Sequence, residues 1–364
     1  MEQLTKPRTE RIPGLDLLKA VAILLVVFVH DNDSFIDFLT KPDVWTFSNY
    51  GLYALIALCV PILFLVNGAL VTNKPFEAKR FFQKTVKIAL LTVIWGVLTL
   101  AALMLLHGDT FSIGTFLRDL WYWKQDYINH LWFFQTMVMI YLFLIVLIPA
   151  WQARTDAFRI FFLCLLVLTA GNALLLAGAN VFQALFRVDV IQGQFNFFNE
   201  FNPFIGNFGY SFAYVLLGGW MFANRERFRT KRWRAIALVA FLAAMLLFIG
   251  YGILLSYSKG ERYLFGTVDY GSIFAFVATA SLFVLSLGYS GNGFFGRVVA
   301  LVGRNTIAVY LLHRMVSFLI WRYLYGISHL VVFSLAVSAV TVPLCALAGE
   351  GLRRIPGIRW LFSI

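Results

Sequence analysis

Long apolar runs divide this chain and leave few folds open to it. Ten runs of roughly 18 or more mostly apolar residues follow one another along its 364 residues. A run of about 20 such residues can cross the hydrocarbon core of a bilayer as a helix. The predicted fold class is therefore all-α, a polytopic transmembrane helical bundle of about ten spans. The predicted spans are 14–31, 50–72, 86–106, 130–150, 158–179, 204–223, 235–257, 270–289, 299–321 and 329–349.

The distribution of charge predicts the orientation of the bundle. Ten spans place both termini on one side, and if this side is inside, the inner segments hold 21 of the 30 Lys and Arg, whereas the outer loops hold seven. Such an excess is typical of cytoplasmic segments. We therefore expect both termini to be cytoplasmic, and we attribute the net charge of +12 to this bias and not to a nucleic-acid partner. Neither an internal repeat nor a soluble linker is evident, which predicts a single membrane-embedded domain over residues 1–364 with no appended soluble domain.

The first span carries ionisable residues along a single face. Lys19 and His30 are eleven residues apart, which is close to three helical turns and about 16.5 Å along the axis. Ionisable groups inside a membrane are costly and are typical of functional sites. The alternative is that Asp16 and Lys19 form an i,i+3 pair at the membrane edge while His30 marks the opposite interface.

Basic residues also share a face where the third span begins. Arg80, Lys84 and Lys87 recur at i, i+4 and i+7 and would together offer several cations to a polyphosphate. The alternative is simple anchoring, because Lys and Arg at membrane edges commonly extend toward the headgroups.

Two further spans carry polar side chains at bilayer depth. Asn67 lies in the second span, near Pro61. In the ninth span, Tyr310, His313 and Arg314 lie within about one turn of each other, which is costly unless they face a cavity or opposite charges.

An aromatic outer loop leads into the fourth span. It ends in the sequence NHLWFF, which contains His130 and Trp132. These rings either form part of an interfacial aromatic belt or provide a stacking surface for a sugar or isoprenoid acceptor.

Five segments, in this order and spacing, resemble the acyltransferase-3 family of bacterial inner-membrane O-acyltransferases that modify surface polysaccharides. They read LDLLKAVAILLVVFVH, VPILFLVNGALV, KRFFQKTVKIALLTVIW, NHLWFF and GRNTIAVYLLH. In that family the first helix carries a basic residue, then ten further residues, then a histidine held to be essential for catalysis, which matches Lys19 and His30. Lys84 and Lys87 stand where the family usually has paired arginines, and Lys19 also replaces an arginine. Asn67 stands in place of a serine before Gly68, and the family's Trp and closing Tyr and His match Trp132, Tyr310 and His313.

This resemblance implies an integral-membrane O-acyltransferase of the bacterial cytoplasmic membrane. The expected co-substrate is acetyl-CoA or another acyl-CoA, with no permanently bound cofactor and no metal. The expected acceptor is a glycan or lipid-linked sugar, and membrane lipids and glycan-assembly proteins are the other expected partners. Catalytic candidates are His30, His313 and Tyr310, donor-binding candidates are Lys19, Arg80, Lys84 and Lys87, and acceptor-binding candidates are Trp132, His130 and Asn67. A transporter or flippase for a lipid-linked sugar or small anion is the alternative, since buried charges also serve as transport sites.

Overall fold

The computed structural model describes residues 11–31, 38–110, 112–123, 125–188, 209–324 and 331–363, and these contain helices and no strands. Eight helical segments in these ranges are long and apolar enough to cross a membrane. They are Pro13–Asp31, Val44–Val71, Ala78–His107, Asn129–Gln152, Asp156–Phe186, Lys231–Lys259, Thr306–Leu324 and Val331–Leu352. By its helix composition the chain is a multi-pass membrane protein.

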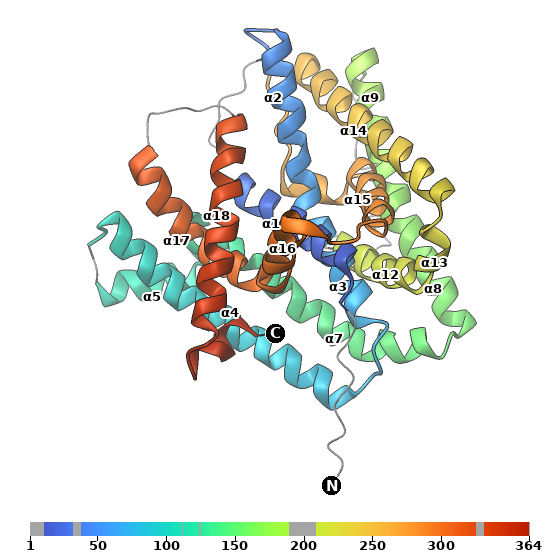
Figure 1. Ribbon diagram of the computed structural model, residues 1–364. Helices are drawn as coiled ribbons and strands as arrows, with labels where there is room; N and C mark the ends of the chain where they lie inside the picture. The colour runs from blue at the N-terminus through green and yellow to red at the C-terminus, as the bar shows by residue number, and fades with distance from the viewer. Residues whose placement is uncertain are drawn as a thin grey trace.

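Each of these segments is one helix or several consecutive helical elements, and shorter helices lie between the segments (Figure 1). The elements are α1 (Pro13–Asp31), α2 (Val44–Ala54), η1 (Leu55–Leu58), α3 (Cys59–Val71), α4 (Ala78–His107), α5 (Ile113–Trp121), α6 (Gln125–Ile128), η2 (Asn129–Leu131), α7 (Trp132–Gln152), α8 (Asp156–Leu166), η3 (Val167–Gly171), α9 (Asn172–Phe186), α12 (Tyr210–Ala223), α13 (Arg225–Phe228), α14 (Lys231–Lys259), η4 (Thr267–Gly271), α15 (Ile273–Ser286), α16 (Gly293–Arg304), α17 (Thr306–Leu324), α18 (Val331–Leu352) and η5 (Ile358–Phe362). Side-chain caps explain several of the starts, because Ser112, Thr155, Thr230 and Ser272 accept backbone N–H bonds at the first turns of α5, α8, α14 and α15.

Three of the predicted spans differ from the structure. The spans 204–223 and 270–289 correspond to α12 and α15, which have 14 residues each. Helices of this length extend about 21 Å, which is less than the hydrocarbon core of about 30 Å. The ninth predicted span, 299–321, is broken, because α16 ends at Arg304 and α17 begins at Thr306. The prediction of ten full spans is thus wrong in detail, and residues 204–208 lie outside the described residues.

Helix α1 lies at the centre of the bundle (Figure 1). It packs against α3, α15, α16, α17 and α18. Eleven of its residues are buried, among them both acidic side chains, Asp16 and Asp31. The polar groups of the first predicted span therefore face neighbouring helices instead of lipid.

The packing of α3 against α12 is the most extensive helix pair in the structure and depends on two glycines. A Cβ atom at Gly68 would overlap the carbonyl oxygen of Val215, and one at Gly218 would overlap the carbonyl oxygen of Leu65. Small residues allow helix backbones to approach closely, which is a common way to pack helices in membranes. Gly68 follows Asn67, so the close contact also fixes the position of this polar side chain.

We expect Gly68→Ala to lower the free energy of unfolding by about 1–3 kcal/mol, because the added methyl group must push two backbones apart. The measurement is thermal or denaturant unfolding of the purified protein in detergent. Gly250→Ala in α14 is the matched control, since a Cβ there meets nothing within 4 Å. Equal stability of the two variants would contradict this account of the packing.

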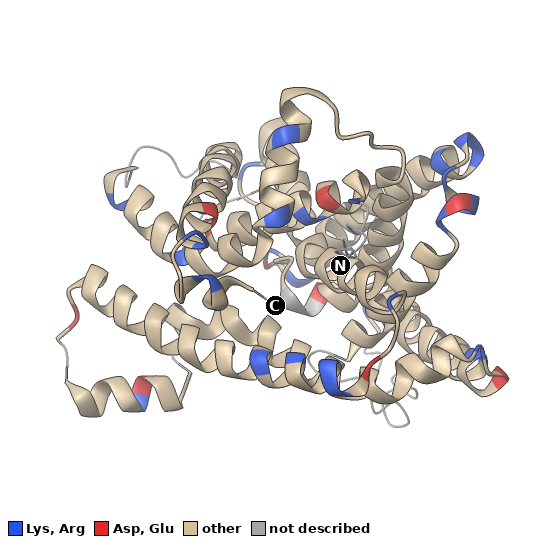
Figure 2. Ribbon diagram, turned by 60° about the horizontal axis from the view of Figure 1, so that its bottom comes forward, with Lys and Arg blue, Asp and Glu red and all other residues tan. Residues whose placement is uncertain are grey.

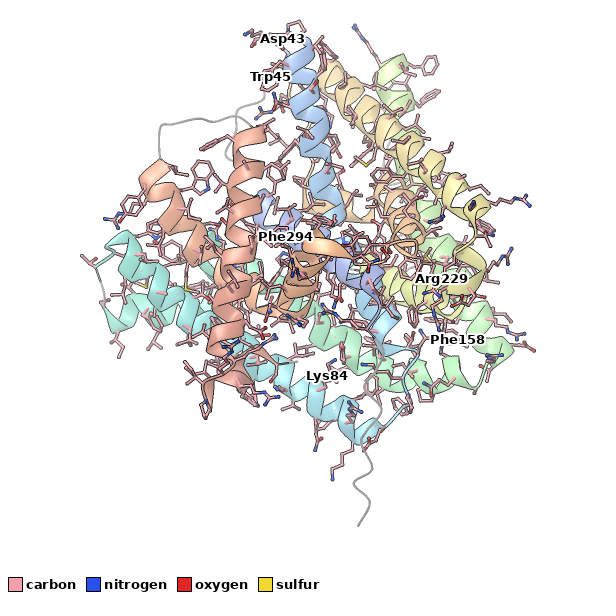
Figure 3. The ribbon with its side chains drawn as sticks, viewed as in Figure 1. Asp43, Trp45, Lys84, Phe158, Arg229 and Phe294 are labelled. Atoms are coloured by element: carbon pink, nitrogen blue, oxygen red, sulfur yellow. The ribbon has the colours of Figure 1, made fainter. Side chains whose placement is uncertain are left out.

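The orientation in the membrane stays a prediction, and the structure offers positions that test it. Asp43 and Trp45 lie at one end of the molecule, away from Lys84 (Figure 3). In a protein whose native cysteines are replaced by alanine, we expect Lys41→Cys to react with an impermeant maleimide from outside intact cells. Lys231→Cys should react only after the cells are opened, because both positions are exposed but are predicted on opposite sides. The reverse pattern would overturn the N-inside orientation.

Candidate active site

Three histidines from distant parts of the chain come together at one end of α1. His30 lies in the last turn of α1, His130 in η2 and His313 in α17. The ring centroids are 5.3 Å apart for His30 and His313, 5.3 Å for His130 and His313, and 6.1 Å for His30 and His130. We call these residues the histidine cluster, and all three were candidates from the sequence.

Hydrogen bonds hold two members of the cluster in place. Nδ1 of His313 lies 2.7 Å from the carbonyl oxygen of Tyr310. Because a carbonyl only accepts, Nδ1 carries the proton, and Nε2 of the neutral ring keeps its lone pair. The hydroxyl of Tyr310 donates to the carbonyl oxygen of His130. Tyr310 thereby ties η2 to α17, which positions His130 beside His313.

A cavity of about 450 Å³ opens beside the cluster. His30, His130, Trp132 and Tyr310 line it, whereas His313 is fully buried and lies outside its lining. The structure thus brings together four residues that the sequence analysis had assigned to catalysis or to acceptor binding.

Opposite charges lie around the same cavity. Arg314 lines it and is within electrostatic reach of His30 and of Asp31. Asp31 is only 4% exposed, and one of its oxygens accepts a hydrogen bond of 3.1 Å from Ser338 in α18. Arg314 was recognised from the sequence, but Asp31 was not, although it directly follows His30.

A second set of polar residues lies at the beginning of α4, where the sequence contains several basic residues (Figure 2). Nζ of Lys84 lies 4.8 Å from the ring centroid of Tyr141, whose hydroxyl donates to Oδ1 of Asn67 at 3.4 Å. Asn67 and Lys84 are therefore neighbours through Tyr141. Asn67 follows the cavity residue Val60 by two turns of α3, which is about 10 Å.

Two more cations lie near Lys84. Burial and the positive charges of Lys84 and Arg80 lower the pKa of Lys74, which lies between α3 and α4. We call Lys74, Arg80 and Lys84 the cation cluster. Like charges held this close favour the binding of an anion, because an anion relieves their repulsion.

Lys87 is within electrostatic reach of Lys84, but its side chain also has partners of its own, and its role in donor binding stays a prediction. Its Nζ donates to Oγ of Ser363 at 2.7 Å and lies 5.3 Å from the ring centroid of Trp360. Lys87 thus contacts the last residues of the chain, and this contact could not be read from the spacing of the basic residues.

Lys19 is engaged within the protein. Its Nζ lies 2.8 Å from Oδ1 of Asp16 and donates to the carbonyl oxygen of Gly303 at 2.9 Å. The Asp16–Lys19 pair considered from the sequence is therefore present, but it ties α1 to α16 inside the bundle instead of lying at the surface. A role of Lys19 in donor binding stays a prediction.

The residues that line the cavity include several that the sequence analysis did not identify. Tyr53 comes from α2, Cys59 from α3 and Tyr270 from η4. Sγ of Cys59 lies 3.3 Å from the hydroxyl of Tyr270. In a chain with 17% aromatic residues, a single tyrosine does not indicate a site. Only the tertiary structure could therefore identify these lining residues.

Comparison with known families identifies the family of the chain. A family model described as an acyltransferase domain matches residues 12–350, which include every candidate site residue. The chain belongs to the acyltransferase 3 family. The resemblance inferred from the five motifs is thereby confirmed. As a member of acyltransferase 3, the protein is a membrane transferase that transfers acyl groups.

Comparisons with curated proteins and with solved structures returned no match.

Proposed function

We propose that the protein transfers an acyl group, most simply acetyl, from cytoplasmic acyl-CoA to a hydroxyl of a cell-surface or lipid-linked glycan, in the bacterial cytoplasmic membrane. The observation that carries this proposal is the cavity in which His30, His130 and Arg314 meet. Family membership supplies the acyl transfer, and the cavity supplies a base and a cation at one place.

His30 is the proposed general base, because it borders the cavity whereas His313 is fully enclosed. It takes the proton of the acceptor hydroxyl while the hydroxyl oxygen attacks the thioester carbonyl. The oxyanion of the tetrahedral intermediate lies near Arg314, whose positive charge stabilises it. Collapse of the intermediate forms the ester and releases the CoA thiolate, which takes the proton back from His30.

The cation cluster is the proposed site for the phosphates of the CoA donor. It lies on the side predicted to be cytoplasmic, where acyl-CoA is available, and Lys84 is held there against Tyr141. Lysine binds phosphate as a point charge and not through the paired bonds of arginine. The acyl-bearing arm would pass Asn67 along α3 to the cavity.

The acceptor is proposed to reach the cavity from the opposite end. Trp132 stacks at 6.2 Å on Tyr270, and together with His130 it provides aromatic and polar surface for a sugar. Glycan-assembly proteins are the proposed partners that supply or receive this acceptor.

We expect His30→Ala and His30→Asn to lower the rate of CoA thiol release by about 10²–10⁴-fold, because the transfer loses its general base. The measurement is thiol release from acetyl-CoA with a glycan acceptor, and acetyl-CoA binding should stay close to that of the wild type. His107→Asn is the matched control, because His107 lies at the end of α4, outside the cavity lining. A folded His30→Asn protein with near-normal turnover would refute the mechanism.

For the donor site, we expect Lys84→Gln to raise the Kd for acetyl-CoA by about tenfold. This is the usual effect of losing one hydrogen bond to a charged group. The Kd of the variant should also depend less on salt, because one of the screened charges is gone. Equilibrium binding at low and high ionic strength measures both effects. Lys231→Gln, an exposed lysine on the same predicted side, should change neither, and an unchanged Kd for Lys84→Gln would end this assignment.

A further inference from the structure

A second cavity, of about 240 Å³, shares a wall with the histidine cavity. The shared wall is the segment around η4. Gly266 and Tyr270 line the histidine cavity, whereas Asp269 and Gly271 line the second cavity. None of the residues proposed above for base, donor or oxyanion binding lines this second cavity.

The second cavity lies against membrane helices, and several of its lining side chains are polar. Helices α9, α14 and α15 pack against one another (Figure 1), and each contributes residues to the lining of this cavity. Thr169, Asn172 and Asn180 contribute polar side chains from the candidate span Asp156–Phe186. Within this span, residues Val167–Gly171 form a π-helical turn, a feature that is frequent at functional sites. Polar side chains on the inner face of a membrane helix are costly and point to a ligand.

Two hydroxyl groups of this lining lack partners among the described residues. The hydroxyls of Thr169 and Tyr210 are buried and have no hydrogen-bond partner among the described residues, and the two side chains are 7% and 9% exposed. Nδ2 of Asn180 donates to the hydroxyl of Tyr251 at 2.8 Å, which leaves that hydroxyl its own proton to donate. A ligand that both donates and accepts hydrogen bonds would match the hydroxyl and amide groups of this lining.

The described lining offers no positive charge to an anionic ligand. No Lys or Arg lines the cavity among the described residues, and Asp269 is its acidic group. Asp269 accepts from the hydroxyl of Tyr263 at 2.6 Å and from the N–H of Gly266 at 2.9 Å, so it fixes the aromatic wall. Phosphate groups of CoA or of a lipid are therefore poor ligands here.

Aromatic rings and paired donors and acceptors together suit a sugar. The rings of Tyr251, Tyr263 and Phe274 provide apolar faces, and the hydroxyl and amide groups match the hydroxyls of a pyranose. A volume of 240 Å³ corresponds to about eight water molecules, which is room for one ring and not for a chain of rings.

We propose that the second cavity binds a sugar unit of the acceptor that neighbours the unit being acylated. The acceptor would extend across η4, with its reacting hydroxyl at the histidine cluster and the next ring between α9 and α14. This inference rests on the proposed function, and it adds that the enzyme selects acceptors of at least two sugar units.

The test compares thiol release from acetyl-CoA with two matched pairs of acceptors, methyl β-galactoside with lactose and methyl β-glucoside with cellobiose. We expect the kcat/KM of the wild type to be about tenfold or more higher for the disaccharide of at least one pair. This is the usual contribution of a few hydrogen bonds, here to the second sugar. Ala177→Leu, which fills the second cavity, should bring the two acceptors of that pair to similar values while the Kd for acetyl-CoA stays unchanged.

Two further variants control for folding and size. Gly178→Leu adds similar bulk at the next residue, where a Cβ meets nothing within 4 Å, and should keep the preference for the disaccharide. Tyr251→Phe keeps the ring but removes one hydroxyl, so the preference should fall by about 2–10-fold.

The two proposals fail in different ways. Equal use of mono- and disaccharides by the wild type, or an undiminished preference in Ala177→Leu, would overturn the second sugar site alone. Absence of thiol release with all four acceptors would count against a glycan acceptor, and thus against the proposed function and the inference that rests on it.

Discussion

The need to pair charged groups inside the membrane organises this protein around α1. The helix carries Asp16 and Lys19 near one end and His30 and Asp31 at the other. At the first end Lys19 and Asp16 pair with each other, and Lys19 also binds the carbonyl of Gly303 in α16. At the second end, the neighbours come from α17 and α18. A helix whose polar side chains contact three other helices cannot turn this face to lipid, so it occupies the centre.

The site follows from the break that separates α16 from α17. Asn305 lies in this break, and its side chain bonds the carbonyl of Leu301 and the carboxylate of Glu350. Helix α17 is therefore a separate helix that does not continue α16. Its course brings Tyr310 and His313 to the end of α1. Because Tyr310 also holds the backbone of His130, one short segment of α17 positions both of the other histidines.

Much of the fold could be predicted from apolar length, because a membrane demands long uninterrupted helices. The prediction failed where tertiary packing replaces lipid, as in α12, whose close contact with α3 buries it although it has 14 residues. It failed again at Asn305, where a side chain ends a helix inside an apolar run. Of the candidate site, His30, His130 and Trp132 were found because ionisable and aromatic residues in such runs are conspicuous. The partners of Asp31 and Lys84 come from distant helices, and no local pattern reports them.

The last turn of the chain bears on how this protein is handled in the laboratory. Segment η5 packs against α4, where the indole N–H of Trp95 donates to the carbonyl of Leu361 at 3.0 Å and Lys87 holds Ser363. A purification tag fused after this segment would lie beside the basic end of α4. Assays with a tagged protein would then mix properties of the enzyme with those of the tag. Cleavage of such a tag before kinetic work is therefore part of a sound assay.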